Sequence, residues 1–328
     1  MVSQKKTPGM NTRKICRYTK STLTRVKGRL YSKKALNIHD IHYKQPTKKD
    51  MAVGLVYFNS SGSKRLLMNY LYTVEKMKLA KIPYYTIEMY TDTPDIADAI
   101  HIKTDFILFQ KERLCYVLEK HIPKTFKKLL FMDTDLIFDN ENWYNDASNK
   151  LDTFELIQCF SNVYNLDITY RIKTGSFLSY KMHKAFPNVE KTSPGGAWAF
   201  QRDWYNKVGF FQHDPMGGSD VMSLKAWTGG EYRPEKEIPR HLSRVYEEFT
   251  KKITELPSIC YIEGGIYHLW HGTSKNRQYG VRSKIFRNVN DIMDIMKVND
   301  DDIFELTDTS YRKRIMDYFL KKDDDGVE

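Results

Sequence analysis

The amino-acid sequence predicts an α/β fold, in which a mostly parallel central sheet is flanked by helices. Short apolar runs at residues 52–58, 84–90 and 128–132 are typical of strands that are buried on both faces. Between the first two runs, residues 64–80 carry apolar side chains at helical spacing, and Pro83 ends the helix. This strand–helix–strand order predicts parallel strands joined by right-handed crossovers.

The alternation continues along the first half of the chain. Turn-forming residues at 91–95 precede a weak candidate strand at 106–109 and a helix at 112–121. A further apolar run at 154–160 predicts another buried strand. The periodicity weakens from residue 162 to 191, where we expect loops and antiparallel pieces.

Size and composition are those of a globular protein with a sizeable core. The chain has 328 residues, of which 41% are hydrophobic and 13% aromatic. It has no apolar run of about 18 residues and no apolar stretch after its first basic residues, so we expect a cytoplasmic protein. The four cysteines are scattered: Cys16, Cys115, Cys159 and Cys260. Because no two of them form a Cys-x-x-Cys pair, we expect free thiols.

The net charge of +11 is concentrated at the start of the chain. Residues 1–50 contain fourteen Lys and Arg but two acids, a balance of +12, so the other 278 residues sum to −1. We therefore expect a basic, disordered arm at 1–49, a globular domain at 50–300, and a C-terminal helix with a frayed acidic tail at 301–328. The arm suits contact with an anionic surface or partner, although it holds no nucleic-acid-binding motif.

The strongest chemical signal is a pair of carboxylates after the apolar run at 128–132. Side chains alternate along a strand, so Asp133 and Asp135 are expected to point to the same side. Open α/β sheets bind their ligands at the carboxyl ends of their strands. With no Lys or Arg beside them, two carboxylates there repel each other unless a cation such as Mg²⁺ or Mn²⁺ lies between. The alternative interpretation of so short a pattern is a solvated acidic turn.

Two glycine-rich stretches in the second half are further candidates. Gly195 and Gly196 precede a predicted strand and helix, and paired glycines let the backbone approach a ligand closely. An ordinary turn is the alternative. Asp220 follows Gly217 and Gly218 at the start of a predicted helix, so it is a candidate general base. The alternative is a helix cap.

A histidine pair comes next in the chain. His268 and His271 are three residues apart and can share a metal ion where the chain turns. Lys275 and Arg277 follow them and carry charge suited to a phosphate. The alternative is two histidines packed among aromatic residues.

In this order, the motifs resemble those of the GT-A glycosyltransferases, with the metal-dependent β-1,4-galactosyltransferase type as the nearest likeness. The resemblance covers about residues 51–290. The run at 264–285 is also similar to the C-terminal signature of bacterial and large-virus members, on His268, His271, Gly272, Arg277, Tyr279 and Arg282. The resemblance implies a Rossmann-like GT-A domain, a nucleotide-sugar donor, first of all a UDP-sugar, and a glycan or protein acceptor. A viral source would put the protein in the host cytoplasm or the virion.

The resemblance also implies a role for each motif. Asp133 would reach the donor ribose, or the metal through water, and Asp135 would bind Mn²⁺ or Mg²⁺ directly. His268 and His271 would complete the metal shell. The remaining donor contacts would come from Phe58, Asn59, Gly195, Gly196, Lys275 and Arg277.

Asp220 would be the general base of a displacement that inverts the anomeric carbon. The family commonly shows Glu-Asp where this chain has Ser219-Asp220, and the missing acid leaves the acceptor contacts open. Three alternatives remain at this point. A haloacid-dehalogenase-type phosphatase would use Asp133 and Asp135, a zinc hydrolase would use Asp135 with the two histidines, and a polyanion-binding protein would act through the basic arm with a degenerate GT-A body.

Overall fold

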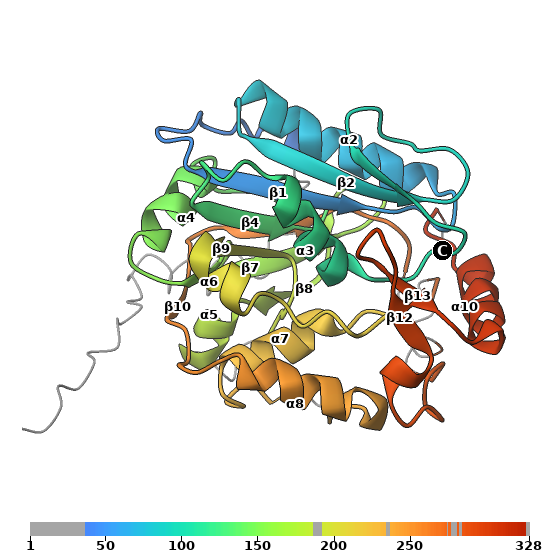
Figure 1. The fold of residues 1–328 in the computed structure, drawn as a ribbon. Coiled ribbons are helices and arrows are strands. Elements are labelled where there is room, and N and C mark those ends of the chain that lie inside the picture. The colour runs from blue at the N-terminus through green and yellow to red at the C-terminus, as the bar shows by residue number, and fades with distance from the viewer. Residues whose placement is uncertain are drawn as a thin grey trace, which may run out of the picture.

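A computed structural model describes residues 37–185, 192–233, 237–273, 275–276, 281 and 284–325. A seven-stranded sheet in the order β10-β6-β9-β4-β1-β2-β3 forms its centre (Figure 1). The strands are β1 (Met51–Tyr57), β2 (Tyr84–Tyr90), β3 (Ile100–Lys103), β4 (Lys128–Met132), β6 (Leu156–Gln158), β9 (Ala197–Gln201) and β10 (Ile259–Tyr261). Strand β9 runs antiparallel to β4 and β6, and the other neighbouring pairs are parallel. The mostly parallel central sheet is therefore confirmed.

Helices cover both faces of this sheet. The described helices are α2 (Lys64–Leu79), α3 (Lys111–His121), α4 (Trp143–Leu151), α5 (Tyr180–Ala185), α6 (Arg202–Lys207), α7 (Ser219–Trp227), α8 (Ser243–Lys251) and α10 (Thr309–Lys321), of which α10 packs on the small sheet of β12 (Met296–Val298) and β13 (Phe304–Leu306). Short 3₁₀ turns lie at Ile38–Asp40, Arg240–Leu242 and Ile292–Asp294. Among the described residues, none of the helices has both the length and the apolar character needed to cross a membrane.

Strand β1 shows why the chain needs both helical layers. It is buried along its whole length. Val53 and Leu55 pack into a cluster with α2 and α4, whereas Ala52 and Val56 pack with α3 on the opposite face. Because successive side chains of a strand point to opposite faces, a continuous apolar run requires cover on both.

A second sheet, in the order β5-β11-β7-β8, brings distant segments to the end of β4. Its strands are β5 (Leu136–Phe138), β7 (Asn162–Leu166), β8 (Ile172–Leu178) and β11 (Gly265–His268). Strands β5 and β11 pair antiparallel, with His268 opposite Leu136. This register places the histidine pair beside the acidic pair. Strands β12 and β13 form a two-stranded sheet next to helix α10.

The third strand of the central sheet is not where the sequence pattern placed it. Strand β3 is Ile100–Lys103, a short segment with alternating exposure. The apolar run at 106–109 forms no strand of this sheet, although Phe109 makes an isolated bridge to Met216. Ile107 and Leu108 are buried in the core as the chain enters α3, so their apolar character reflects packing and not strand pairing.

Both ends of the described chain pack against the body. The start of the segment at residues 37–49 packs against α2, where Lys76 Nζ donates to the Ile41 carbonyl (2.7 Å). Further on, the Tyr43 hydroxyl accepts from the Phe138 N–H (3.0 Å), and the Thr47 N–H donates to Asn145 of α4 (2.8 Å). Residues 1–36 lie outside the described part of the chain. The expected fraying of the acidic tail is wrong for Lys322–Asp325, where Asp324 is only 1% exposed. Polar contacts with α2 hold this segment.

The cysteines follow the expectation in part. Cys115 and Cys159 are free and buried. Cys260 is disulfide-bonded, so the expectation of four free thiols is corrected at that position.

Candidate functional site

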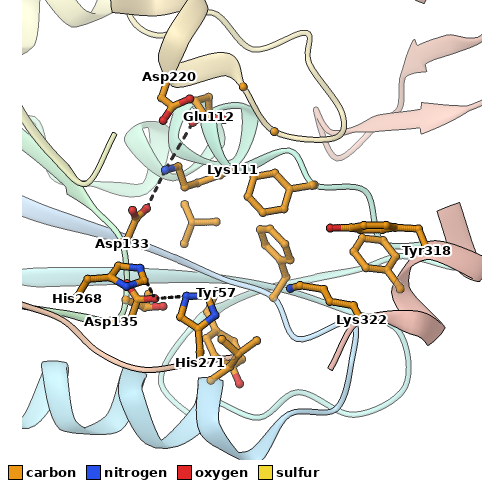
Figure 2. A pocket seen from close by; sticks show the side chains of 18 residues that line it. Tyr57, Lys111, Glu112, Asp133, Asp135, Asp220, His268, His271, Tyr318 and Lys322 are labelled. Carbon is orange, nitrogen blue, oxygen red and sulfur yellow. Dashed lines mark hydrogen bonds and ion pairs between the residues drawn. The ribbon is translucent and has the colours of Figure 1, made fainter. Parts of the chain in front are cut away.

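A cleft of about 280 Å³ lies at the carboxyl ends of β1 and β4 (Figure 2). Five elements contribute its walls: the end of β1, the start of α3, the β4–β5 turn, the start of α7, and β11 with the turn that follows. Helix α10 and Lys322 close the remaining side. Parallel strands of an α/β sheet end at one edge, where ligands bind. The position therefore agrees with the site that the sequence predicts.

Asp135, His268 and His271 converge in this cleft. The Asp135 Oδ2 lies 3.4 Å from His268 Nε2 and 3.0 Å from His271 Nε2. The Leu269 N–H also donates to the Asp135 carbonyl (2.8 Å), which ties the end of β11 to the β4–β5 turn. More than 130 residues separate the aspartate from the histidines in the sequence, and strand pairing brings them together.

The turn after β11 aims the second histidine back at the cleft. Gly272 follows His271 with a φ of 88°, which residues with a Cβ rarely adopt. A Cβ at this position would also lie 2.9 Å from the Asp323 carbonyl oxygen. Glycine is therefore required both by the backbone conformation and by the close approach of the C-terminal segment.

The three side chains fit a divalent metal ion. One ligand atom from each lies within 4.8 Å of the other two. A carboxylate with two imidazoles suits borderline divalent ions, whereas Mg²⁺ prefers a shell of oxygen atoms. The donor set thus favours Mn²⁺ over Mg²⁺ among the two ions expected from the sequence. Asp135 is only 8% exposed, so an ion there would compensate a desolvated charge.

The other acid of the pair has a different partner. Lys111, at the start of α3, places its Nζ 2.8 Å from Asp133 Oδ1. Burial disfavours a charged amine, but Asp133, Glu112 and Asp220 raise the pKa of Lys111 well above its ordinary value. The sequence expectation that no cation lies beside the acidic pair is therefore wrong, because α3 supplies one from a distant part of the chain.

Asp220 lies at the start of α7 and lines the same cleft. Gly218, the preceding N-cap, has a φ of 140°, and its missing Cβ leaves room for Asp214 Oδ2, 2.6 Å from where that atom would be. A Cβ at Gly195 would lie 2.5 Å from Asp220 Oδ2. One glycine of the Gly195–Gly196 pair thus makes room for the Asp220 carboxylate.

Glu112 is a cleft residue that the sequence interpretation missed. Its side chain is buried, its Oε1 lies 3.6 Å from Lys111 Nζ, and its Oε2 has no hydrogen-bond partner among the described residues. Burial raises the pKa of Glu112 to about 7, Lys111 opposes the rise, and Asp220 adds to it. The sequence carries little signal for this role, because Glu112 stands between Lys111 and Arg113 in the first turn of a helix, where acids are common.

The remaining predicted donor contacts are placed in several ways. Phe58 lines the cleft and meets Phe109 edge to face, with ring centroids 5.2 Å apart. Asn59 instead donates to the Ser63 carbonyl (3.0 Å) and to Asp95 (3.2 Å), beside a neighbouring cavity of about 400 Å³. Lys275 is exposed and lies outside the cleft lining.

Of the last two predicted donor contacts, one contributes only its backbone and the other lies outside the described residues. The Gly196 carbonyl accepts from the Asp133 N–H (2.9 Å), so this glycine contributes backbone and not a cleft surface. Arg277 lies outside the described residues. Helix α10 adds lining residues that no motif announced: Tyr318, Phe319 and the following Lys322.

No family model and no curated protein matches this sequence. Among solved structures, the chain is similar to GalNAc-T7 with UDP, GalNAc and Mn²⁺ (12% identity, TM-score 0.36), with 72% of this chain and 48% of that one covered. It is similar to a mutant Drosophila β-1,4-galactosyltransferase 7 with manganese, UDP-Gal and xylobiose (12%, 0.36; 66% and 94% covered). It is also similar to a Pyrobaculum calidifontis mannosyltransferase with GDP-Man and Mn²⁺ (13%, 0.41; 80% and 67% covered).

The chain spans about half the length of the GalNAc-T7 structure. At these identities and TM-scores, the similarities assign neither a family nor an activity to this protein.

Proposed function

We propose that this protein is a metal-dependent glycosyltransferase of the GT-A type. It moves a sugar from a nucleotide-sugar donor to a hydroxyl of a glycan or protein acceptor, and a UDP-sugar is the first candidate for the donor. The observation that carries this proposal is the convergence of Asp135, His268 and His271 on the cleft at the end of β4. The same cleft receives Asp220 from α7, so one space offers both a metal site and a carboxylate base.

Asp135, His268 and His271 would hold the metal ion, with Mn²⁺ preferred to Mg²⁺. When bound, such an ion supplies Lewis-acid stabilisation of the charge on a departing diphosphate. Phe58, at the end of β1, offers aromatic surface to the nucleotide base. Lys111 compensates Asp133, so the donor meets a locally neutral pair there.

Asp220 takes the proton of the acceptor hydroxyl as its oxygen attacks the anomeric carbon. The sugar–phosphate bond breaks on the opposite side, which gives inversion. General-base catalysis of this kind contributes about 10²–10⁴ in rate. The Val221 N–H, in the first turn of α7, donates to Asp220 Oδ1 (2.8 Å) and orients this carboxylate.

Glu112 supplies a second carboxyl group near Asp220. Ser219, which stands where the resembled family shows Glu, is fully buried and does not line the cleft. Helix α3 therefore brings an acid, Glu112, into the cleft in place of the one missing at position 219. With a pKa raised to about 7, Glu112 holds a proton at slightly acid pH and can donate to an acceptor hydroxyl or ring oxygen.

The alternative activities fit this geometry less well. A haloacid-dehalogenase-type phosphatase needs a free nucleophilic aspartate and an oxygen-rich Mg²⁺ shell. Here Lys111 pairs with Asp133, and two imidazoles face Asp135. A zinc hydrolase would share the metal ligands, but the His-Glu-x-x-His helix motif of that chemistry is absent from the sequence. The polyanion interpretation depends on the arm at 1–49, of which residues 1–36 lie outside the described structure.

The direct test is release of nucleotide from a panel of UDP-, GDP- and dTDP-sugars with Mn²⁺ and mixed glycan acceptors. We expect one donor to release its nucleotide in a metal-dependent way, with no release by Asp135→Ala. Deletion of residues 1–36 should leave this activity intact. Hydrolysis of a simple aryl phosphate without any donor turnover would instead support the phosphatase.

A further inference from the structure

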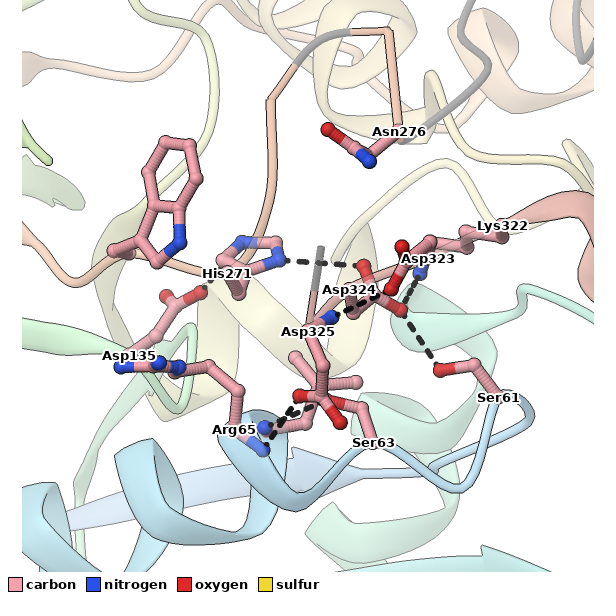
Figure 3. Close-up of polar contacts among 12 residues, drawn as sticks. Ser61, Ser63, Arg65, Asp135, His271, Asn276, Lys322, Asp323, Asp324 and Asp325 are labelled. Carbon is pink, nitrogen blue, oxygen red and sulfur yellow. Dashed lines mark hydrogen bonds and ion pairs between the residues drawn. The ribbon is translucent and has the colours of Figure 1, made fainter. Parts of the chain in front are cut away.

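The C-terminal segment Lys322–Asp325 lies against His271, the second histidine of the cleft (Figure 3). Asp324 is 1% exposed, and its Oδ2 accepts from the Ser61 hydroxyl (2.9 Å) and from Lys322 Nζ (2.8 Å). A buried carboxylate is retained only where such partners compensate its desolvation. The segment is therefore held in one defined position on the protein surface.

The next residue fastens this segment to helix α2. Asp325 accepts from the Ser63 hydroxyl (2.6 Å), the Lys64 N–H (3.0 Å) and the Arg65 N–H (2.9 Å). These donors belong to the N-terminus of a sixteen-residue helix, whose first N–H groups need acceptors and whose dipole favours a negative charge. Residues more than 250 positions apart are thereby joined.

The other oxygen of Asp324 faces a metal-site histidine. His271 Nδ1 lies 3.5 Å from Asp324 Oδ1, while its Nε2 faces Asp135. Apart from this contact, His271 Nδ1 and Asp324 Oδ1 are buried and have no hydrogen-bond partner among the described residues. A neutral imidazole that binds a metal through Nε2 must carry its proton on Nδ1, and that proton then needs a buried acceptor. Asp324 is the acceptor in position.

We propose that Asp324 is a positioning residue that fixes the orientation and tautomer of His271, and that Lys322–Asp325 is a built-in wall of the metal site. This inference rests on the metal site of the proposed function. Partners of this kind raise the affinity of a metal site about 10- to 100-fold. The contact at Gly272, where a Cβ would meet the Asp323 carbonyl, allows the segment to approach this closely.

Calorimetric titration of the full-length, metal-free protein with Mn²⁺ tests the proposal. We expect Asp324→Ala to weaken Mn²⁺ binding about 10- to 100-fold, and Asp324→Asn to recover part of the loss because its amide oxygen still accepts. Asp317→Asn, on the exposed side of α10, is the matched control and should bind as the wild type does. Equal affinity in the wild type and Asp324→Ala would overturn the proposal.

A second readout needs no metal. In a long-range ¹H–¹⁵N spectrum, Asp324→Ala should move the His271 ring proton from Nδ1, which faces Asp324 in the wild type, towards Nε2, which faces Asp135. The His271→Gln variant assigns the signal. Unchanged tautomer populations in Asp324→Ala would contradict the positioning role, whereas a lost fold would show as a collapsed spectrum. Asp325→Ala keeps the Asp324 side chain but removes the bonds that fasten the segment to α2, so it tests the anchor and should also weaken Mn²⁺ binding.

The two proposals fail differently. A wild-type protein that binds no Mn²⁺ refutes the metal site and this inference with it. A wild type that binds Mn²⁺ with an affinity unaffected by Asp324→Ala refutes this inference alone.

Discussion

The two acids of the Asp133-Thr134-Asp135 turn are compensated in different ways. Lys111 Nζ lies 2.8 Å from Asp133 Oδ1, while Asp135 faces His268 and His271. The protein itself therefore neutralises the first acid. The second acid, Asp135, faces only imidazoles, which carry a positive charge only when they are protonated. We therefore assign the metal ion to Asp135 and not to a position shared by both acids.

Lys111→Met should lower stability and at the same time strengthen metal binding. Loss of a charged hydrogen bond costs about 1.5–3 kcal/mol, because Asp133 stays partly buried without its cation. Removing a positive charge near the metal site lowers the repulsion that an incoming Mn²⁺ meets. Urea unfolding and Mn²⁺ titration measure the two effects. Weaker Mn²⁺ binding in this variant would contradict the separation of roles.

Asp220→Asn should slow transfer at least about 100-fold and leave donor binding unchanged, because the amide cannot take the acceptor proton. Steady-state kcat and donor affinity in the presence of Mn²⁺ separate the two properties. Asp203→Asn, in the first turn of α6 and exposed, is the matched control. A rate within a few-fold of the wild type would exclude Asp220 as the base.

Glu112 predicts a pH dependence of stability in the metal-free protein. Its pKa of about 7 in the folded state exceeds the unfolded value of 4.5, so the folded state keeps a proton that the unfolded chain releases. This contribution is fully present below pH 4.5 and is lost as the pH rises through about 7. At 1.36 kcal/mol per pKa unit, the loss is about 3 kcal/mol.

Glu112→Gln should abolish that part of the pH dependence, so that the variant gains stability relative to the wild type above pH 7. Denaturant unfolding at several pH values between 4 and 8 measures it. Glu75→Gln, on the exposed side of α2, should follow the wild-type curve. Parallel curves for the wild type and Glu112→Gln would show that Glu112 titrates normally.

The glycine pair should separate catalysis from folding. A Cβ at Gly195 meets Asp220 Oδ2 at 2.5 Å, and the end of a side chain can shift, so Gly195→Ala should fold but lose rate. Gly196 has a φ of 94°, so Gly196→Ala should lower stability by about 1–3 kcal/mol. Thermal unfolding and turnover of both variants make the comparison. Full activity in Gly195→Ala would show that Asp220 needs no fixed position.

The sequence predicted the parts of this fold that local patterns determine. The apolar run of β1 and the one-sided helix α2 appear within a residue or two of their expected bounds. The pairing of β5 with β11 could not be predicted, because register between distant strands depends on tertiary packing and not on either segment alone. Without that pairing, the meeting of His268 with Asp135 was an inference from motif order.

The missed site residues have a common cause. Lys111 and Glu112 belong to a helix whose pattern predicted only a buried apolar face, and the fold turns its first residues into the cleft. Asp324 lies in an acidic segment whose composition is typical of a solvated chain end. Ser61 and Lys322 nevertheless bind Asp324, and the N-terminus of α2 binds Asp325. Composition alone does not show such long-range partners.

The most direct test of the central claim is the stoichiometry of Mn²⁺ binding, followed by electron paramagnetic resonance in the wild type and in Asp135→Ala. We predict one bound Mn²⁺ per wild-type chain and an affinity at least about 100-fold lower in the variant, since a direct ligand matters more than the outer partners whose loss costs 10- to 100-fold. Stoichiometric Mn²⁺ binding that survives Asp135→Ala undiminished, or no stoichiometric binding in the wild type, would contradict the account.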